Sequence, residues 1–253
     1  DGEFVRSLHP GEAAIINDDG VEYLRPFEEE QESPCVFELI YFSRPDSTVF
    51  GEQVYAMRRR SGEILAEESH VDSDVVIPVP DSGVPAALGY SEQTGVPYEL
   101  GLIRSHYIGR TFIEPEDAVR NLRIRLKLSP MKELLQGKRV VVVDDSIVRG
   151  NTSQQIVDLL QGAGVEEVHF RVAAPPIVGP CYYGIDTPTR DELIAASRDV
   201  EDICDHIGAD SLAYLSLEGM REAANTTFDE KDRPEYCEAC FTDDYPIAIP
   251  EDA

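Results

Sequence analysis

The sequence is poor in positive charge. Of its 253 residues only 22 are Lys or Arg, against 49 Asp or Glu, and the formal net charge is −27. Lysine occurs only at Lys127, Lys132, Lys138 and Lys231. A nucleic-acid-binding protein needs a basic face to contact phosphates, so this charge argues against that class. The acidic residues are spread along the whole chain, which favours a surface adapted to high salt, where counterions screen self-repulsion.

Long apolar runs and targeting patterns are also missing. The chain has no stretch of about 18 apolar residues and no signal-peptide pattern. We therefore expect a soluble, cytoplasmic protein that does not enter a membrane. In such a protein the five cysteines are not expected to form structural disulfides. The chain begins with Asp1 rather than Met, and we expect it to be a piece of a longer protein.

The segment 140–153, with the sequence VVVVDDSIVRGNTS, has the strongest pattern in the chain. Its four valines are typical of a buried parallel strand, which Asp144 and Asp145 end. After Gly150, the apolar residues of 156–160 recur at helical spacing. A polar turn at a helix N-terminus directs N–H groups at a phosphate, and two carboxylates suit a ribose diol or Mg²⁺. An ordinary strand–helix turn with a Thr or Ser N-cap is the alternative.

Strand-like and helix-like segments alternate along the chain. Strands are expected at 35–47, 74–80, 97–103, 140–143 and 167–174, and helices at 51–65, after 80–83, at 131–135 and after Gly150. This alternation predicts an α/β fold with a doubly wound parallel sheet. Residues 181–240 are expected to form a helical and irregular C-terminal cap. Ligands of such sheets bind at the carboxyl ends of the strands, where the acidic turn lies.

Two further segments have compositions suited to phosphate groups. Pro80-Asp81-Ser82-Gly83 follows the strand 74–80, and N–H groups around a glycine can form an anion-binding nest, although such turns are common without a function. Residues 104–127 form a basic island in an acidic chain and contain Arg104, Arg110, Arg120, Arg123, Arg125 and Lys127. Positioned cations stabilise an anionic leaving group, whereas a solvated helix face with ion pairs would have the same composition.

The motifs together resemble one enzyme family. The apolar run, Asp144-Asp145, Gly150 and Thr152-Ser153 resemble the phosphoribosylpyrophosphate (PRPP) signature of type I phosphoribosyltransferases. DDSIVRG, PDSG and YIGRTFI are most similar to glutamine PRPP amidotransferases. Asn151 stands where that family usually has Thr, and Ser105-His106 where it commonly has Asn-Arg. The resemblance implies a type I phosphoribosyltransferase fold and the first step of de novo purine synthesis. In that step PRPP and ammonia, supplied by glutamine in the complete enzyme, give 5-phosphoribosylamine and pyrophosphate.

The resemblance also implies roles for individual residues. Asp144 and Asp145 would grip the ribose hydroxyls as catalytic residues, and with Ser82 they would hold Mg²⁺. The other catalytic residues would lie on a loop that closes over the substrate: Tyr107, Arg110 and Lys127. The pyrophosphate of PRPP would contact Asp81, Ser82 and Gly83. Its 5-phosphate would contact the signature loop, which consists of Ser146, Ile147, Val148, Arg149, Gly150, Asn151, Thr152 and Ser153.

The cysteines suggest a metal centre. Cys237-Glu-Ala-Cys240 brings two thiolates within reach of one metal, and such a pair alone fits a redox couple, half of a zinc site or chance. One branch of the amidotransferases holds a [4Fe–4S] cluster, and the resemblance assigns its ligands to Cys35, Cys181, Cys237 and Cys240. Zinc or an empty site is the alternative. Cys204, in an expected amphipathic helix, is interpreted as a small buried residue.

The first residues indicate a second domain. Residues 1–27 are expected to form two short strands around an Asn-Asp-Asp-Gly turn and resemble the end of the N-terminal glutaminase (Ntn-type) domain of the amidotransferases. Residues 28–253 would then form the phosphoribosyltransferase domain with its cap, and the rest of the glutaminase domain would be missing from this chain. The resemblance further implies a homo-oligomer inhibited by purine nucleotides, and the acidic composition resembles that of halophilic proteins.

Two other functions compete with the amidotransferase reading. One is a type I enzyme of purine or pyrimidine salvage. This function would not explain the presence of the four cysteines or of the N-terminal strands. The other is a non-catalytic regulator that binds PRPP or a nucleotide on the same fold. Such a regulator tends to lose the pyrophosphate loop or the closing loop, and this chain keeps the sequences of both.

Overall fold

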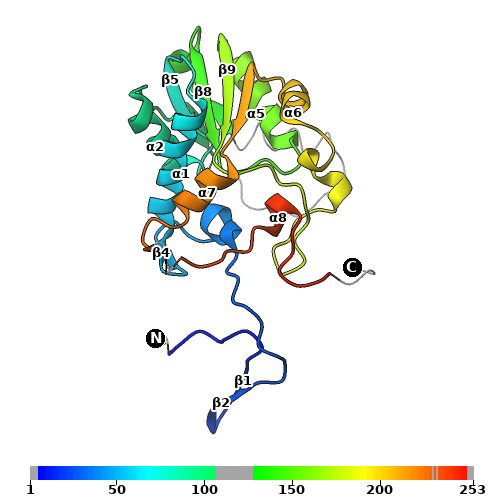
Figure 1. Cartoon of the computed structure of the whole chain (residues 1–253). Coiled ribbons are helices and arrows are strands. Elements are labelled where there is room, and N and C mark those ends of the chain that lie inside the picture. The colour runs from blue at the N-terminus through cyan, green and yellow to red at the C-terminus, as the bar shows by residue number, and fades with distance from the viewer. Residues whose placement is uncertain (1–4, 106–127, 230, 232, 250–253) are drawn as a thin grey trace.

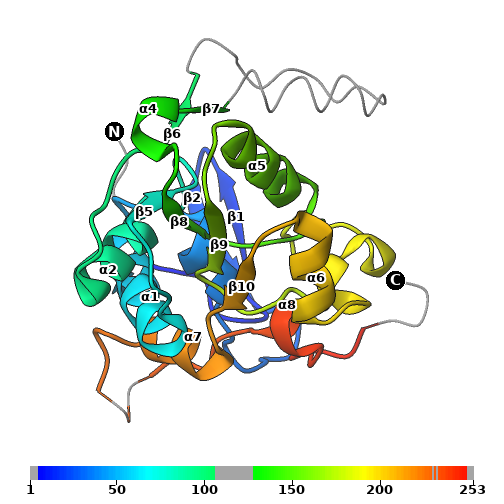
Figure 2. The same ribbon diagram turned by 90° about the horizontal axis from the view of Figure 1, so that it is seen from above.

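The computed structural model describes residues 5–105, 128–229, 231 and 233–249. At its centre is a four-stranded parallel sheet with the order β10-β9-β8-β5. These strands are β5 (Val75–Pro78), β8 (Arg139–Asp144), β9 (Glu167–Val172) and β10 (Ser211–Tyr214). Helices α1 (Val54–Ser69) and α2 (Val84–Thr94) cover one face, and α5 (Asn151–Gly162) and α6 (Val200–Ile207) cover the other (Figures 1 and 2). The expected α/β class is confirmed.

The central strand β8 explains why the sheet is covered on both faces. Val141 and Val143 pack into the core on the side of α1 and α2, whereas Val140 and Val142 pack into the core on the side of α5 and α6. Successive side chains of a strand point to opposite faces, so a run of valines is buried on both. Strand β8 is thus an interior strand of the sheet, between β9 and β5. Its last residue, Asp144, lies at the carboxyl edge of the sheet.

Two expected strands differ from the structure. Residues 35–47 do not form a strand: they contain the π-helical turn η1 (Glu38–Phe42), with Leu39 and Ile40 buried and Tyr41 and Phe42 exposed. This prediction was wrong because a short apolar run has the same composition in a strand and in a buried helical turn. Only Cys35 takes part in a β-bridge. The short strands β3 (Thr48–Val49) and β4 (Glu52–Gln53) follow and pair with each other.

The segment 97–103 is only partly a strand. Within it, Tyr98 forms a single parallel bridge to Val76 of β5. Pro97 has no N–H and contributes only its carbonyl, which accepts from the N–H of Val76 at 2.8 Å. The chain then leaves the sheet and forms β6 (Leu102–Arg104), which pairs antiparallel with β7 (Leu128–Pro130). The short helix α4 (Lys132–Leu135) follows, as expected.

The C-terminal cap contains a strand that the sequence pattern did not predict. Strand β10 is only four residues long and half-buried at the edge of the sheet, so it lacks the apolar run of a central strand. The remainder is irregular with short helices, as expected: η2 (Arg190–Glu192), η3 (Ile194–Ala196), α7 (Leu217–Ala223) and α8 (Ala239–Thr242). Helix α7 packs against α1, and α8 lies below the sheet in Figure 1.

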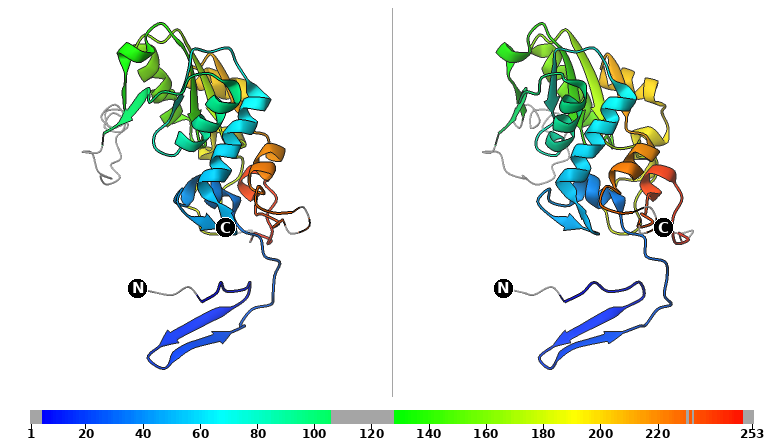
Figure 3. Two further views of the ribbon diagram at one scale, coloured as in Figure 1. Left: turned by 90° about the vertical axis from the view of Figure 1, so that its left-hand side faces the viewer. Right: turned by 60° about the vertical axis from the view of Figure 1, so that its left-hand side comes forward.

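The N-terminal residues form the expected hairpin. Strands β1 (Ala13–Asn17) and β2 (Gly20–Leu24) are antiparallel and are joined at the Asn-Asp-Asp-Gly turn. Figure 3 shows the hairpin apart from the body, at the end of an extended segment. Several large apolar side chains, including Ile16 and Val21, are exposed on it. Within the described part of the chain, no helix has the length and apolar character needed to cross a membrane.

Candidate functional site

Two adjacent carboxylates lie at the carboxyl end of β8. Asp144 and Asp145 are each only 7% exposed. The N–H of Asp145 donates to Oδ1 of Asp144 at 2.9 Å, and the hydroxyl of Ser146 donates to Oδ1 of Asp145 at 2.5 Å. The pair is therefore held in a defined geometry by its own loop.

Burial and mutual repulsion make this pair costly to ionise. Burial, with the nearby charge of Asp145, raises the pKa of Asp144 well above its ordinary value. Burial also raises the pKa of Asp145, although hydrogen bonds from Ser146 and Ser82 and the charge of Arg58 oppose the rise. Two buried carboxylates side by side need donors or a cation to be stable in the charged form. The strand end thus suits a ligand that brings hydroxyls or a metal.

The N-terminus of α5 faces the same edge and suits an anion. Gly150 has φ +78°, and a Cβ there would lie 2.7 Å from Cδ1 of Ile194, so a side chain has neither the conformation nor the space. Gly150 makes no side-chain cap, and the first-turn N–H groups of Asn151, Thr152 and Ser153 have no partner within the helix. A helix of 12 residues with free N–H groups at its start is a phosphate site of a common kind.

The signature loop is held by hydrogen bonds to residues 192–194 of the C-terminal cap. The carbonyl of Val148 accepts from the N–H of Ile194 at 3.0 Å, and Nε of Arg149 donates to Glu192 at 3.0 Å. Ile147 is buried in the core on the side of α5. Its side chain therefore anchors the loop, and any contact of Ile147 with a ligand would come from its backbone.

The second predicted loop lies beside the first. The N–H of Val79 donates to the carbonyl of Val143, and the N–H of Gly83 donates to the carbonyl of Val79 at 3.0 Å. A Cβ on Gly83 would lie 2.4 Å from the carbonyl oxygen of Val143, so only glycine allows this close approach to β8. The Pro80–Asp81 peptide is cis. Ser82 lines a small cavity together with Asp145, which places the two predicted loops against each other.

Of the predicted closing loop, the structure describes only the first residues, Arg104 and Ser105, and the last residue before β7 is not described. Tyr107, Arg110 and Lys127 lie outside the described residues. Arg104, at the end of β6, donates from Nη1 to Oδ2 of Asp81 at 2.5 Å. This ion pair joins the base of the basic segment to the loop 81–83.

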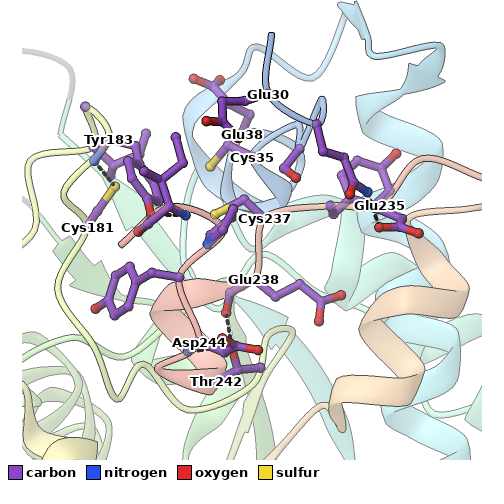
Figure 4. Close-up of a pocket in the computed structure, with 18 of the residues that line it drawn as sticks. Glu30, Cys35, Glu38, Cys181, Tyr183, Glu235, Cys237, Glu238, Thr242 and Asp244 are labelled. Carbon is purple, nitrogen blue, oxygen red and sulfur yellow. Dashed lines mark hydrogen bonds between the residues drawn. The ribbon is translucent and has the colours of Figure 1, made fainter. Parts of the chain in front are cut away.

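The four cysteines that were predicted as ligands line one region next to η1. Cys35, Cys181 and Cys237 line a cavity of about 770 Å³, and all four line a smaller apolar cavity of about 20 Å³ next to it. Figure 4 shows the larger cavity, with Cys35 and Cys237 near its centre and Cys181 towards one side. Carboxylates and tyrosines, together with Arg221, are prominent in the rest of its lining: Glu30, Glu38, Glu235, Glu238, Asp244, Tyr183, Tyr236 and Tyr245.

Burial favours the protonated form of three of these thiols. It raises the pKa values of Cys35, Cys237 and Cys240, and the neighbouring cysteines raise them further. Four cysteines that line one cavity supply the type of donor that a thiolate-bound metal group uses, but their side chains are not gathered into a closed ligand set in this structure. Among the described residues no three His, Cys, Asp or Glu side chains are close enough to hold a single ion.

Cys204 is separate from this group. It lies in α6, as expected, and its sulfur donates to the carbonyl of Ala209 at 3.2 Å. Cys204 is half-buried rather than fully buried.

Two buried charged residues in and just before α1 were not predicted. Arg58 of α1 is 6% exposed, and Glu52 is fully buried, where it accepts from Thr226 and from the N–H and hydroxyl of Thr227. Arg58 lies in the buried stripe of α1 with Ser61 and Leu65, so its helical spacing was a usable signal. Glu52 has no such signal, because its partners are distant in the sequence.

Comparison with known proteins identifies relatives of this chain. The family model described as phosphoribosyl transferase domain matches residues 53–181. The amidophosphoribosyltransferase of Synechococcus elongatus is 51% identical over 250 residues, which cover 99% of this chain and 50% of the relative. The enzyme of the same name from Bacillus subtilis is 50% identical over 249 residues, covering 98% of this chain and 52% of the relative. The chain thus spans about half the length of the curated relatives it matches.

A solved structure has the same fold. The glutamine PRPP amidotransferase of Bacillus subtilis, complexed with ADP and GMP, superimposes with a TM-score of 0.84 at 50% identity. The match covers 98% of this chain and 54% of that chain. The resemblance inferred from the motifs is confirmed by these similarities, and the chain belongs to the phosphoribosyl transferase domain family.

Proposed function

We propose that this chain binds PRPP at the carboxyl edge of the sheet and transfers its phosphoribosyl group to ammonia, with glutamine as the ammonia source in the complete protein. One observation supports it most: Ser82 of the pyrophosphate loop and Asp145 of the signature loop line the same cavity. The two loops can therefore hold the two ends of one PRPP molecule. Relatives named amidophosphoribosyltransferase, similar along nearly the whole chain, favour ammonia over a base as the acceptor.

Each part of PRPP has a matching group in the described site. The N-terminus of α5 would hold the 5-phosphate, the carboxylates of Asp144 and Asp145 would accept from the ribose hydroxyls, and residues 81–83 would hold the pyrophosphate. In the reaction the nitrogen lone pair forms a bond to C1, the bond between C1 and the pyrophosphate oxygen breaks, and pyrophosphate leaves with that electron pair. The site would act by orienting these groups and balancing charge. Tyr107, Arg110 and Lys127 are proposed to complete it.

The donors at the strand end fit Mg²⁺. Two buried carboxylates, whose pKa values burial raises, and the hydroxyl of Ser82 supply the oxygen ligands that this ion prefers, usually together with waters and substrate phosphates. We therefore propose Asp144, Asp145 and Ser82 as its holders. When bound, the ion would neutralise charge on the pyrophosphate.

A [4Fe–4S] cluster is our proposal for the cysteine cavity, with Cys35, Cys181, Cys237 and Cys240 as ligands. Four sulfurs around one cavity support it, and zinc or an empty site is the alternative. The cluster would act structurally, since it would join the segments that begin at Cys35 and end at Cys240. The five cysteines form no disulfide with one another, which fits a reducing compartment such as the cytoplasm.

Purine nucleotides are the proposed inhibitors. The solved relative is described as complexed with ADP and GMP, and a nucleoside phosphate presents the same ribose and 5-phosphate as PRPP. The N-terminus of α5 and the two aspartates would hold these groups in either ligand.

The release of pyrophosphate tests the proposed function. The chain is incubated with PRPP, Mg²⁺ and one acceptor: ammonium, glutamine, adenine or orotate. We expect release with ammonium only, because the tested chain has no N-terminal cysteine to hydrolyse glutamine. Turnover with a base and not with ammonium would instead support a salvage enzyme. PRPP binding without turnover on any acceptor would support a regulator.

A further inference from the structure

Arg58 is a buried arginine held by backbone carbonyls. Its Nε donates to the carbonyl of Leu39 and its Nη2 to the carbonyl of Ser43, both at 2.8 Å. Among the described residues, the carboxylate that acts on it through charge is that of Asp145. A buried guanidinium without a bonded carboxylate is costly, because burial disfavours its charged form. Because water does not solvate Arg58, its charge must serve some interaction inside the protein.

One side of Arg58 is the segment that contains Cys35. Leu39 lies in η1 and Ser43 directly follows it. The N–H of Ser43 donates to the carbonyl of Glu38 at 2.9 Å and so closes the turn. Cys35 lies just before this turn, separated from it by Val36 and Phe37, and is itself bridged to Cys237. A displacement of the Cys35 segment would therefore move the two carbonyls that hold the guanidinium.

The other side of Arg58 is the PRPP site. Arg58, Ser82 and Asp145 line one cavity of about 10 Å³, about the space of one water molecule. The positive charge of Arg58 and the carboxylate of Asp145 therefore face the same small space. The guanidinium thus lies behind the carboxylate that is proposed to face the ribose.

We infer that Arg58 is a positioning residue of the PRPP site, which holds Asp145 and Ser82 in place and transmits to them the position of the Cys35 segment. The inference rests on the proposed function of that site. Two fixed carbonyls orient the guanidinium plane, and the fixed positive charge attracts one of two neighbouring carboxylates that otherwise repel each other. Arginine suits this role because its planar fork reaches two carbonyls at once, whereas lysine provides a single point charge.

The affinity for PRPP with Mg²⁺, measured by calorimetry on the 253-residue chain, tests the inference. Arg58→Gln should raise the Kd roughly tenfold or more, because it removes the positive charge beside Asp145 and the guanidinium that the two carbonyls hold. Arg58→Lys should restore part of the affinity, since it keeps the charge and loses the fork. The matched control is Arg59→Gln, which removes an exposed arginine of the same helix that pairs with Glu92 and should leave the Kd unchanged.

The outcomes separate the inference from the proposed function. No PRPP binding by the unchanged chain would overturn the proposed function. Binding by the unchanged chain with equal affinity in Arg58→Gln would overturn the inference alone. If Arg58→Gln does not fold, as judged by circular dichroism, Arg58→Lys decides: an affinity equal to that of the unchanged chain would contradict the positioning role.

Coupling to the cysteine segment needs its own measurement. Cys35→Ser is combined with Arg58→Lys in a double-mutant cycle on the PRPP Kd. If Arg58 transmits the position of the segment, Cys35→Ser should raise the PRPP Kd clearly when Arg58 is present. In the Arg58→Lys variant, the same substitution should raise the Kd by a factor at least about threefold smaller. Equal effects in both backgrounds would contradict the coupling. Cys204→Ser is the control and should change neither Kd.

Discussion

Cys35 and Cys237, which are far apart in the sequence, are bridged to each other as parallel β-residues. The N–H of Cys237 donates to the carbonyl of Pro34 at 2.8 Å, and the N–H of Val36 donates to the carbonyl of Cys237 at 3.3 Å. The backbone alone therefore brings two of the four proposed ligands together. A metal group would strengthen an arrangement that hydrogen bonds already favour.

The metal content of the cysteine cavity can be tested directly. Anaerobically purified protein should be brown and contain iron and acid-labile sulfide, and Cys240→Ser should abolish both. Cys204→Ser should keep the colour, because its sulfur lies in α6 and bonds to Ala209. Zinc in a one-to-one ratio without sulfide would rule out the cluster, and protein free of either metal would leave the cavity empty.

Asp144→Asn should stabilise the ligand-free chain while weakening PRPP binding. Burial raises the folded-state pKa of Asp144, so the folded chain binds this proton more tightly than the unfolded chain does. The free energy of unfolding therefore falls as the pH rises from the ordinary value of 3.8 to the folded-state pKa, and the penalty is complete above it. Asparagine removes that penalty and can still accept from the N–H of Asp145.

Urea unfolding at neutral pH without Mg²⁺ measures this effect. The gain in the free energy of unfolding should be on the order of 1 kcal/mol, whereas PRPP affinity should fall roughly tenfold or more. Asp158→Asn, on the exposed face of α5, is the control for the loss of one negative charge. A destabilised Asp144→Asn, or one with unchanged PRPP affinity, would contradict this account of the strand end.

Gly83→Ala should distort the pyrophosphate loop. The new methyl group would lie 2.4 Å from the carbonyl of Val143 and 2.9 Å from that of Val79, and both are backbone atoms that cannot rotate away. We expect a loss of about 1–3 kcal/mol in the free energy of unfolding and a large loss of PRPP affinity. Gly162→Ala is the matched control, because nothing lies within 4 Å of its added methyl. Similar results for both variants would argue against steric contact as the cause.

Glu52→Ala should loosen the segment that leads to the C-terminal cysteines. The buried carboxylate of Glu52 accepts from the hydroxyls of Thr226 and Thr227 and from the N–H of Thr227 at 2.7–3.0 Å. Its removal breaks these three hydrogen bonds and empties a fully buried position, at a cost of about 1–3 kcal/mol. Thermal unfolding and proteolysis after residue 226 measure the effect, with the exposed Glu166→Ala as control. Unchanged stability would show that the threonines find other acceptors.

Local rules were sufficient to predict the signature segment from the sequence. The valines of 140–143, the two aspartates and Gly150 follow one another within a strand, a turn and a helix, each of which depends on neighbouring residues. The structure confirms this order, with β8 ending at Asp144 and α5 beginning at Asn151. The same rules did not identify η1 or β10, because a short apolar or half-buried segment has no distinctive period.

Contacts between distant residues were decided by the tertiary structure. No spacing in the sequence places Arg58 behind Asp145 or Glu52 against Thr227, since these pairs meet only when α1 packs on the sheet and the C-terminal segment returns to it. For the four cysteines, the sequence determined the type of donor, and family resemblance suggested the set. Their gathering around one cavity depends on a backbone bridge between Cys35 and Cys237, because long-range hydrogen bonds form only after the intervening chain has folded.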